Sequence, residues 1–140
     1  MKILLAADGS IYTRHAVNYL IKHLDMFGGQ PDLQVVHVRQ MIPGRAASAL
    51  SKTVIQKYYA DETAKALAPA RRLLDKAGLK YKVSQLIGDP GSEVAALAKK
   101  AKVDLVVMGS HGHGALGSLV LGSAAGKVLA NCKIPVLIVR

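Results

Sequence analysis

Short apolar runs recur along the chain, and their spacing predicts five β-strands. The runs occupy residues 3–7, 33–38, 81–87, 103–108 and 134–139. Each is bounded by Gly, Pro, Asp or other turn-forming residues, as expected for strands in a globular domain. In the third run, Tyr81, Val83 and Ile87 alternate with more polar neighbours. That run therefore predicts a strand with one side in contact with water.

Between the strands, apolar residues recur every three or four positions, which predicts four helices. The helical patterns lie in residues 16–24, 59–77, 90–101 and 124–130. Ser10 is a predicted N-cap, and Asp89 followed by Pro90 predicts a cap with proline at the first helical position. Gly78 is expected to end the long helix. Pro69 lies inside that helix and is expected to kink or split it, because proline removes one backbone donor.

Strands and helices alternate throughout, which predicts an α/β fold with a parallel sheet and helices on both faces. Right-handed crossovers leave the flavodoxin-like order and the Rossmann-like order 3-2-1-4-5 as the leading topologies. In the second, which we favour, the first and fourth strands are neighbours at a topological switch point. Ligands bind there, beyond the carboxyl ends of the strands. Asp8 ends the first strand and Gly109 the fourth, so both are expected to border one crevice.

Length and composition support a single domain spanning residues 1–140. The chain is 51% hydrophobic, enough to bury a substantial core. We expect no signal peptide, because the apolar run after Lys2 is short, and no stretch approaches the ~20 apolar residues of a membrane span. Cys132 is the only cysteine. A single thiol fits a reducing compartment, and we expect a cytoplasmic protein.

The net charge is +10 and favours an anionic partner. The basic residues are scattered, however, and the longest cluster is Lys99, Lys100 and Lys102. Few aromatic residues are available for stacking on bases, and no nucleic-acid motif is present, so we expect no nucleic-acid binding. A basic protein that binds acidic partners stays open as an alternative function.

A glycine-rich segment from Gly109 to Ser123 follows the fourth strand. Glycines let a backbone approach a ligand closely, and successive N–H groups can form an anion-binding concavity. Ser123 opens a helix, whose N-terminus favours phosphate through its free donors and its dipole. The segment therefore predicts a phosphate-binding loop.

Two familiar phosphate motifs fit this segment poorly. Gly112, Gly114 and Gly117 match the dinucleotide pattern G-x-G-x-x-G, but the chain ends before an acidic ribose ligand about twenty residues on. A second stretch, from Gly122 to Val128, imitates a P-loop. It has one residue too few between its glycines and a valine where Ser or Thr must bind magnesium.

The spacing of Gly109, Gly112, Gly122 and Ser123 (G-2x-G-9x-G-S) is similar to the nucleotide-binding signature of the universal stress protein family, in its ATP-binding branch. The segments 3–10, 103–114 and 134–139 resemble that family too. The resemblance implies binding of ATP, or of AMP or ADP, and a homodimer. The residues that it places at the nucleotide are Ala7, Asp8, Val38, Met108, Gly109, Gly112, His113, Gly122, Ser123 and Ala124.

Within this resemblance, Ala7 and Asp8 lie near the adenosine, and Val38 meets adenine through its backbone. Met108 and Gly109 border the ribose and phosphates, and the remaining five residues cradle the phosphates. One departure is that Arg39-Gln40 replaces an acidic residue often found two positions past the matching valine. Ribose-side and metal-side contacts can therefore differ from those of the family.

Several single residues have alternative interpretations. Asp8 could serve only the first helix, but its position favours a ligand role, by hydrogen bonds or by holding Mg²⁺ of a magnesium nucleotide. His111 and His113 could form a metal-binding pair, although solvent-facing or phosphate-contacting roles are favoured. His15, His23 and His37 are interpreted as structural. Cys132 follows a helix end beside Lys133, which can activate a thiolate mildly, but it lacks a visible His–Asp companion and is not expected to be catalytic.

The apolar run 134–139, from Ile134 to Val139, is the edge strand of the predicted order. A bare apolar edge pairs readily with another strand, so a homodimer joined along this edge is expected. The loop lacks an evident general base, arginine finger or Walker lysine. The sequence therefore favours nucleotide binding without catalysis, and the resemblance implies a regulatory, stress-response role. A slow ATPase on the same fold is the alternative.

Overall fold

The computed structural model describes residues 1–114 and 120–140. Its strands form one parallel sheet in the order β3-β2-β1-β4-β5, which confirms the predicted topology. The strands are β1 (Lys2–Ala6), β2 (Asp32–Arg39), β3 (Tyr81–Ile87), β4 (Leu105–Gly109) and β5 (Val136–Val139). The helices are α1 (Ile11–Lys22), η1 (Leu24–Phe27), α2 (Gly44–Ser48), α3 (Lys52–Lys76), α4 (Pro90–Ala101) and α5 (Ser123–Asn131).

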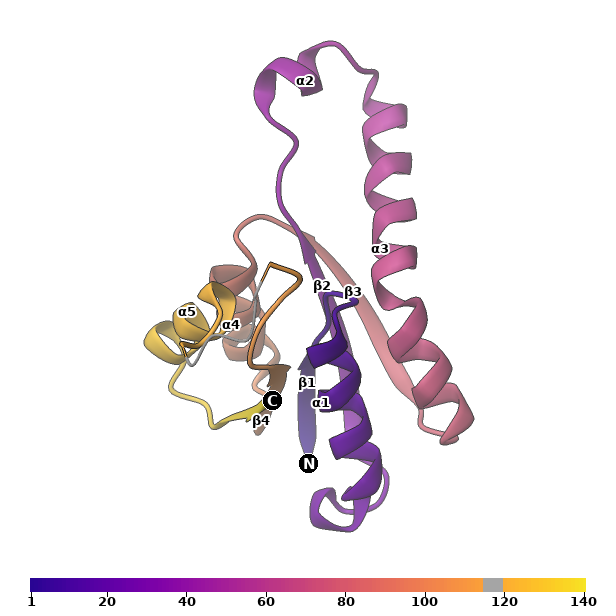
Figure 1. Cartoon of the computed structure of the whole chain (residues 1–140), viewed down its shortest axis with the longest axis vertical. Helices are drawn as coiled ribbons and strands as arrows, with labels where there is room; N and C mark the ends of the chain where they lie inside the picture. The colour runs from indigo at the N-terminus through magenta and orange to yellow at the C-terminus, as the bar shows by residue number, and fades with distance from the viewer. Residues whose placement is uncertain (115–119) are drawn as a thin grey trace.

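Two hydrophobic clusters lie on opposite faces of the sheet. Leu5 and Val35 point toward α1 and α3, whereas Leu4 and Val36 point toward α4 and α5. This alternation follows from the two-residue period of a strand. Figure 1 shows the resulting layers, with α1 and α3 on one side of the sheet and α4 and α5 on the other. Among the described residues, no helix is long and apolar enough to cross a membrane.

The predicted helix caps are present. The Ser10 side chain accepts a hydrogen bond from the backbone N–H of Thr13, and Asp89 accepts one from Ser92. Gly78 follows α3 with φ +69°, the left-handed conformation that ends many helices. These local signals fix where α1, α3 and α4 begin or end, and therefore where the loops between the elements lie.

The expectation that Pro69 would split the long helix is wrong, because α3 runs unbroken through it. A proline inside a helix costs about 3 kcal/mol. Leu67, Ala70 and Leu74, on both sides of Pro69, are buried in the core. Burying a leucine side chain contributes roughly 1.5–3 kcal/mol. Packing of this face therefore offsets the missing backbone hydrogen bond.

The polar segment after β2 contains a short helix, α2, which the sequence pattern did not indicate. No residue of α2 is buried, and the first buried residue of α3 is Tyr59. Figure 1 shows α2 and the first turns of α3 extending past the carboxyl ends of the strands. We call residues 40–58 the arm.

Candidate functional site

A cavity of about 480 Å³ lies at the carboxyl ends of β1 and β4, where the strand order reverses. Small-molecule sites occupy roughly 300–1,000 Å³, so it is large enough for a nucleotide. All ten residues predicted at the site line this cavity: Ala7, Asp8, Val38, Met108, Gly109, Gly112, His113, Gly122, Ser123 and Ala124. The centre of the glycine-rich loop, residues 115–119 with Gly117, lies outside the described residues.

Asp8 is held by the first turn of α1. Its Oδ1 accepts hydrogen bonds from the Ser10 N–H at 2.9 Å and from the Thr13 hydroxyl at 2.8 Å. The Asp8 N–H donates to Thr13 Oγ1 at 3.0 Å. Oδ2 lies on the side of Gly112, 3.0 Å from where a Cβ on that glycine would sit. Two partners therefore fix the carboxylate, and its second oxygen lies beside the glycine-rich loop.

The backbone of Val38 lies beside the crevice because β1 is shorter than β2. The Ala7 N–H donates to the carbonyl of Val36 at 2.9 Å. Every second residue of β2, counted from Val36, therefore directs its backbone N–H and C=O toward β1. Val38, two residues after Val36, directs its backbone groups the same way but lies beyond the end of β1. In the described part of the chain, neither its N–H nor its C=O has a hydrogen-bond partner. One donor and one acceptor are therefore available side by side.

His37 bonds to the acceptor that the Val38 N–H would use if the strand pairing continued. In a continuing ladder that N–H would donate to the carbonyl of Ala7. The buried His37 ring takes this acceptor instead, at 2.8 Å from its Nδ1. A carbonyl can only accept, so Nδ1 carries the proton. His37 was interpreted as structural, and sequence reasoning missed this positioning role because it depends on which strand ends first.

The N-terminus of α5 forms the opposite side of the cavity. Gly122 is its N-cap and provides no side-chain cap. Within the described residues, the backbone N–H groups of Ser123, Ala124 and Ala125 donate to no protein acceptor. Free amides and the helix dipole together make such an end attractive to anions. Ser123 also places a hydroxyl at this end.

The two ends of the glycine-rich loop are tied together at its base. The Gly122 N–H donates to the carbonyl of Ser110 at 2.8 Å. His111 donates from Nε2 to the carbonyl of Val120 at 2.6 Å, which leaves Nδ1 to accept from the Ser110 hydroxyl at 2.8 Å. Both ring nitrogens of His111 are thus used within the loop, and its ring lies 5.1 Å from that of Tyr12.

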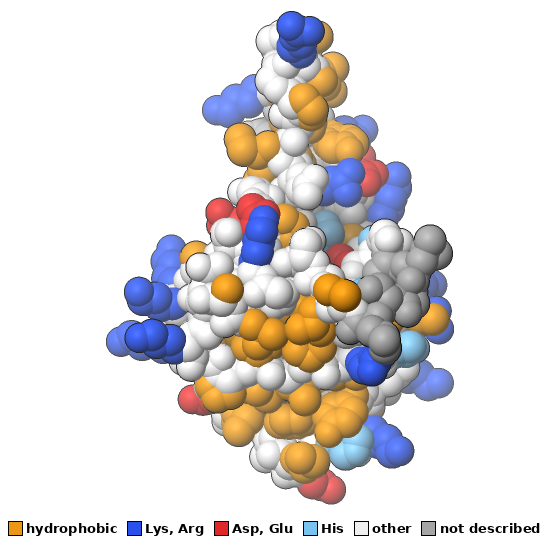
Figure 2. All heavy atoms as spheres, turned by 60° about the vertical axis from the view of Figure 1, so that its left-hand side comes forward, with side chains coloured by type: hydrophobic (Ala, Val, Ile, Leu, Met, Phe, Trp, Pro, Cys, Tyr) orange, Lys and Arg blue, Asp and Glu red, His pale blue; other side chains and the backbone are white. Residues whose placement is uncertain are grey.

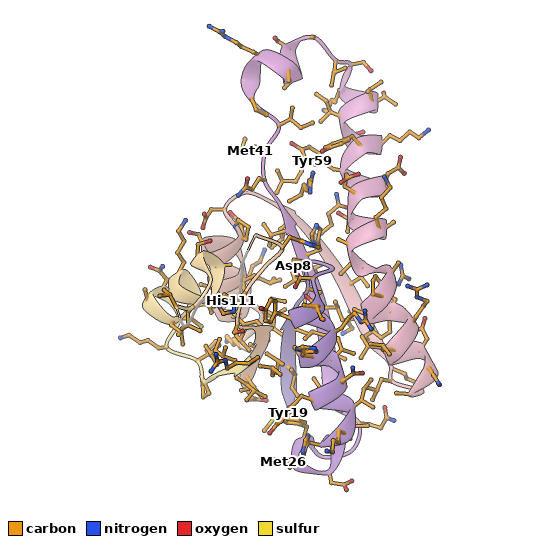
Figure 3. The ribbon with its side chains drawn as sticks, in the orientation of Figure 1. Asp8, Tyr19, Met26, Met41, Tyr59 and His111 are labelled. Carbon is orange, nitrogen blue, oxygen red and sulfur yellow. The ribbon has the colours of Figure 1, made fainter. Side chains whose placement is uncertain are left out.

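His113 links the loop to the segment that follows β1. Its Nε2 donates to the backbone carbonyl of Asp8 at 2.7 Å. Figure 3 shows Asp8 beside the start of α1, with His111 to its left, on the side of α5. The two histidines therefore face different protein partners. Neither ring was expected to bond to the backbone, and the sequence pattern gave no signal for these contacts.

Two of the motif glycines are required by packing inside the protein. A Cβ on Gly109 would lie 2.6 Å from Cβ of Tyr12, and one on Gly122 would lie 3.1 Å from Cα of His111. Larger residues at either position would displace α1 or the base of the loop. Gly112 differs, because a Cβ there would meet only the Asp8 carboxylate in the cavity. The motif therefore combines packing positions with a cavity-facing one.

The start of α4 completes the wall, with Pro90 and Val94 lining the cavity. Asp89 caps this helix and accepts a hydrogen bond from Lys127 of α5 at 2.5 Å. That hydrogen bond lowers the pKa of Asp89 to about 2, with help from Ser92. Gly91 lets the helices approach closely, since a Cβ there would lie 2.5 Å from Cβ of Lys127. The α4 wall is thereby held against α5.

The remaining predicted side chains lie elsewhere. His15 and His23 each donate from Nδ1 to a backbone carbonyl, that of Arg140 at 3.0 Å and that of Tyr19 at 2.8 Å. Cys132 is a free, half-buried thiol that packs against the hydrophobic cluster under α4 and α5. None of the three lines the cavity.

The fold and the cavity define a doubly wound α/β protein with a ligand-sized crevice at the switch point of its sheet. Comparison with known sequences places it more narrowly. The chain matches the model of the universal stress protein family over residues 1–140 and belongs to that family. A Thermus aquaticus universal stress protein is 33% identical over 139 residues, covering 99% of this chain and 97% of the relative. One from Methanocaldococcus jannaschii is 30% identical over 141 residues, covering 99% and 81%.

Solved structures share the fold. A universal stress protein in complex with cAMP matches with a TM-score of 0.72 and 21% identity, covering all of this chain and 97% of that one. The Archaeoglobus fulgidus universal stress protein in complex with dAMP matches with a TM-score of 0.67 and 17% identity, covering 100% and 98%. Both are similar to this chain in the arrangement of sheet and helices.

Proposed function

We propose that this chain is a universal stress protein of the ATP-binding branch, and that it binds an adenine nucleotide in the cavity at the carboxyl ends of β1 and β4. The observation that carries the proposal is the pairing of two features across one cavity. The unpartnered backbone of Val38 lies on one side, and the free N-terminal amides of α5 lie on the other.

The Val38 side suits adenine. Adenine presents an exocyclic amino donor beside a ring-nitrogen acceptor, and the Val38 C=O and N–H complement this pair. Guanine has an exocyclic carbonyl acceptor at the corresponding position and would oppose the Val38 carbonyl. Val36, Val94 and Met108 provide apolar surface along the cavity for a planar base. The proposal therefore predicts adenine over guanine.

The α5 side suits phosphates. The amides of Ser123, Ala124 and Ala125 are expected to donate to phosphate oxygens, with Gly112 allowing close approach. Asp8 fits a magnesium nucleotide, because Oδ1 is occupied while Oδ2 faces the loop. Magnesium is often held by one or two carboxylates together with substrate phosphates. Bound there, it would neutralise phosphate charge beside Asp8.

The ligands of two relatives support adenine as the base of the bound nucleotide. Two universal stress proteins of this fold form complexes with cAMP and with dAMP, and both ligands contain adenine. The choice of ATP rests on the length of the loop motif and on the free α5 amides, which can accommodate more than one phosphate.

We propose that the nucleotide is bound for regulation in a stress response and is not rapidly turned over. Asp8 is the only acidic side chain among the described residues of the cavity wall, and no Lys or Arg is found among them. Oδ1 of Asp8 is already engaged by Ser10 and Thr13. A slow ATPase would show phosphate release that disappears in an Asp8→Asn variant.

We also propose a homodimer joined along β5. This strand is the edge of the sheet and pairs with β4 on one side only. Its four residues are half-buried. Figure 2, which brings this side of the molecule forward, shows hydrophobic side chains gathered over a broad area. A second copy paired along the edge would cover apolar surface and satisfy the outward backbone groups.

Isothermal titration calorimetry with ATP, ADP, AMP and GTP tests the nucleotide proposal. We expect binding of the adenine nucleotides and at least tenfold weaker binding of GTP. Gly112→Ala should weaken ATP binding about tenfold, because its methyl group would press on the Asp8 carboxylate. Gly126→Ala is the matched control, since a Cβ there meets nothing within 4 Å. No heat of binding with millimolar ATP would overturn the proposal.

A further inference from the structure

A second cavity, of about 970 Å³, adjoins the first. It lies between the end of β2, the arm and the face of α3. The two cavities share four wall residues: Asp8, Val38, Pro90 and His113. The proposed nucleotide site therefore continues past the side of Asp8 and Val38 into a space that a mononucleotide in the first cavity leaves free.

A cluster of charged side chains lines this second cavity. Glu62 lies between two cations, with Oε2 at 3.4 Å from Nη2 of Arg39 and Oε1 at 3.2 Å from Nζ of Lys65. One carboxylate between two cations leaves one positive charge unneutralised. We call Arg39, Glu62 and Lys65 the cation cluster.

Arg39 is held in place by Tyr58. Its Nη2 donates to the Tyr58 hydroxyl at 2.8 Å, and its guanidinium lies 5.7 Å from the centre of the Tyr58 ring. The Tyr58 hydrogen bond raises the pKa of Arg39. A guanidinium whose position is already fixed loses less conformational freedom when it binds an oxyanion.

The joined cavities thus have two ends that attract anions and a middle that does not. The α5 amides form one end and the cation cluster forms the other. Asp8 lies at the shared boundary. In the complex without magnesium, its carboxylate repels an anion but accepts a hydrogen bond from a hydroxyl. A ligand that fits the α5 amides, Asp8 and the cation cluster together has a neutral, hydroxylated centre and an anionic group on each side.

We propose that the preferred ligand is an adenosine 5′-nucleotide that carries a further phosphate on its ribose, at the 2′ or 3′ oxygen. The inference rests on the proposed function, since it places the adenosine 5′-phosphate in the first cavity. The remaining ribose hydroxyl donates to Asp8, and the added phosphate reaches Arg39 and Lys65. In dinucleotide-binding folds, an arginine near the ribose accommodates an added phosphate by the same charge pairing.

Calorimetry with adenosine 3′,5′-bisphosphate and adenosine 2′,5′-bisphosphate tests the inference. AMP is the reference, and ADP controls for the number of phosphates, because both of its phosphates are on the 5′ side. We expect at least one bisphosphate to bind about tenfold more tightly than AMP and more tightly than ADP. Equal affinity for AMP and both bisphosphates would overturn the inference and leave the proposed function intact.

Variants of the cluster give the second readout. Arg39→Gln shortens a side chain that is 37% exposed, and Lys65→Ala removes one that is 76% exposed, so neither should disturb the fold. Each substitution should remove most of the difference in affinity between the bisphosphate and AMP, while the affinity for AMP stays unchanged. Lys57→Ala, an exposed lysine of α3 outside the cavity, is the matched control. An advantage that persists in both cluster variants would overturn the inference, and failure of every adenine nucleotide to bind would overturn the proposed function with it.

Discussion

His37 Nδ1 donates to the carbonyl oxygen of Ala7 at 2.8 Å, and this carbonyl is the acceptor that the Val38 N–H would use if the pairing of β1 with β2 continued. The next ladder donor, the N–H of Val38, is left facing the cavity. We therefore expect this core side chain to favour pairing of the Val38 N–H with a ligand over pairing with Ala7.

Replacing His37 by leucine should separate stability from binding. Within residues 1–114 and 120–140, Nε2 of His37 is buried without a hydrogen-bond partner, so leucine removes an unsatisfied polar atom. The freed carbonyl of Ala7 can then accept from the Val38 N–H. We expect unfolding stability no lower than that of the unsubstituted protein, with ATP affinity reduced about five- to tenfold. Urea unfolding and calorimetry measure the two effects.

His15→Ala provides the comparison for this experiment, because His15 is exposed, bonds to the carbonyl of Arg140 and does not line the cavity. It should leave ATP affinity unchanged. Unaltered affinity in His37→Leu would show that the Val38 N–H does not contact the nucleotide.

The ion pair between Asp89 and Lys127 predicts a pH dependence of stability. The folded-state pKa of Asp89 is lowered from 3.8 to about 2. A lowered carboxyl pKa stabilises the fold above the unfolded value, and the contribution is lost as pH falls from about 4 toward 2. Asp89→Asn keeps a cap acceptor for α4 and removes only the charge. Its melting temperature should be slightly lower at pH 6, and the difference should disappear near pH 2.

Lys127→Met removes the other partner of this pair and should show the same convergence at low pH. Melting curves between pH 2 and pH 6 measure how the difference in melting temperature between each variant and the unsubstituted protein changes with pH. A difference between the unsubstituted protein and Asp89→Asn that stays constant over this range would contradict the assignment of the shift to Lys127.

Two glycines with positive φ provide a matched test of packing. Gly9 has φ +81°, and an added Cβ would lie 2.9 Å from the carbonyl oxygen of Ala66 in α3. Gly78 has φ +69° with no atom within 4 Å of that position. Gly78→Ala should cost about 1 kcal/mol for the left-handed backbone alone. Gly9→Ala adds overpacking and should cost about 3 kcal/mol.

Chemical denaturation of the two alanine variants measures this difference. Equal losses of unfolding free energy would mean that α3 shifts away from Gly9 at no cost. The wall of the second cavity at Ala66 would then move more easily than the close contact between Gly9 and Ala66 indicates.

The proposed dimer predicts a selective effect of proline in β5. The carbonyls of Pro135 and Val139 accept from β4, so Ile138, of opposite parity, directs its N–H and C=O to the open edge. Ile138→Pro removes an outward donor and no bond to β4. We expect a folded monomer by circular dichroism and light scattering, where the unsubstituted protein is a dimer. A monomeric unsubstituted protein would contradict the edge pairing.

Features set by neighbouring residues were predictable from the sequence. Ser10, Asp89 and Gly78 act within a few positions of themselves, and the structure confirms each as a cap or stop. Alternation and handedness narrowed the strand order to two topologies, and the structure confirms the favoured one, which brings Asp8 and Gly109 to one cavity. Nucleotide binding by these residues stays a prediction.

Features that depend on contacts far apart in the sequence were not predictable. His37 and Ala7 are thirty positions apart, and their bond depends on β1 ending before β2. The unbroken helix through Pro69 required the packing energy of a core that the local pattern does not contain. The second cavity arises from the placement of the arm, whose short helix carries no apolar period.

The arm also determines how firmly the second cavity is built, because it lines that cavity and not the first. No residue of α2 is buried, α3 has none before Tyr59, and the Tyr59 hydroxyl accepts from the Ile42 N–H at the arm's base. Segments with so few buried contacts open far more often than a core strand. Amide hydrogen exchange should therefore be fast in residues 44–58 and slow in β1 and β4. A ligand confined to the first cavity would leave that contrast unchanged. A ligand that reaches the cation cluster would slow exchange in the arm, so exchange in this exposed segment would report on binding at the sheet.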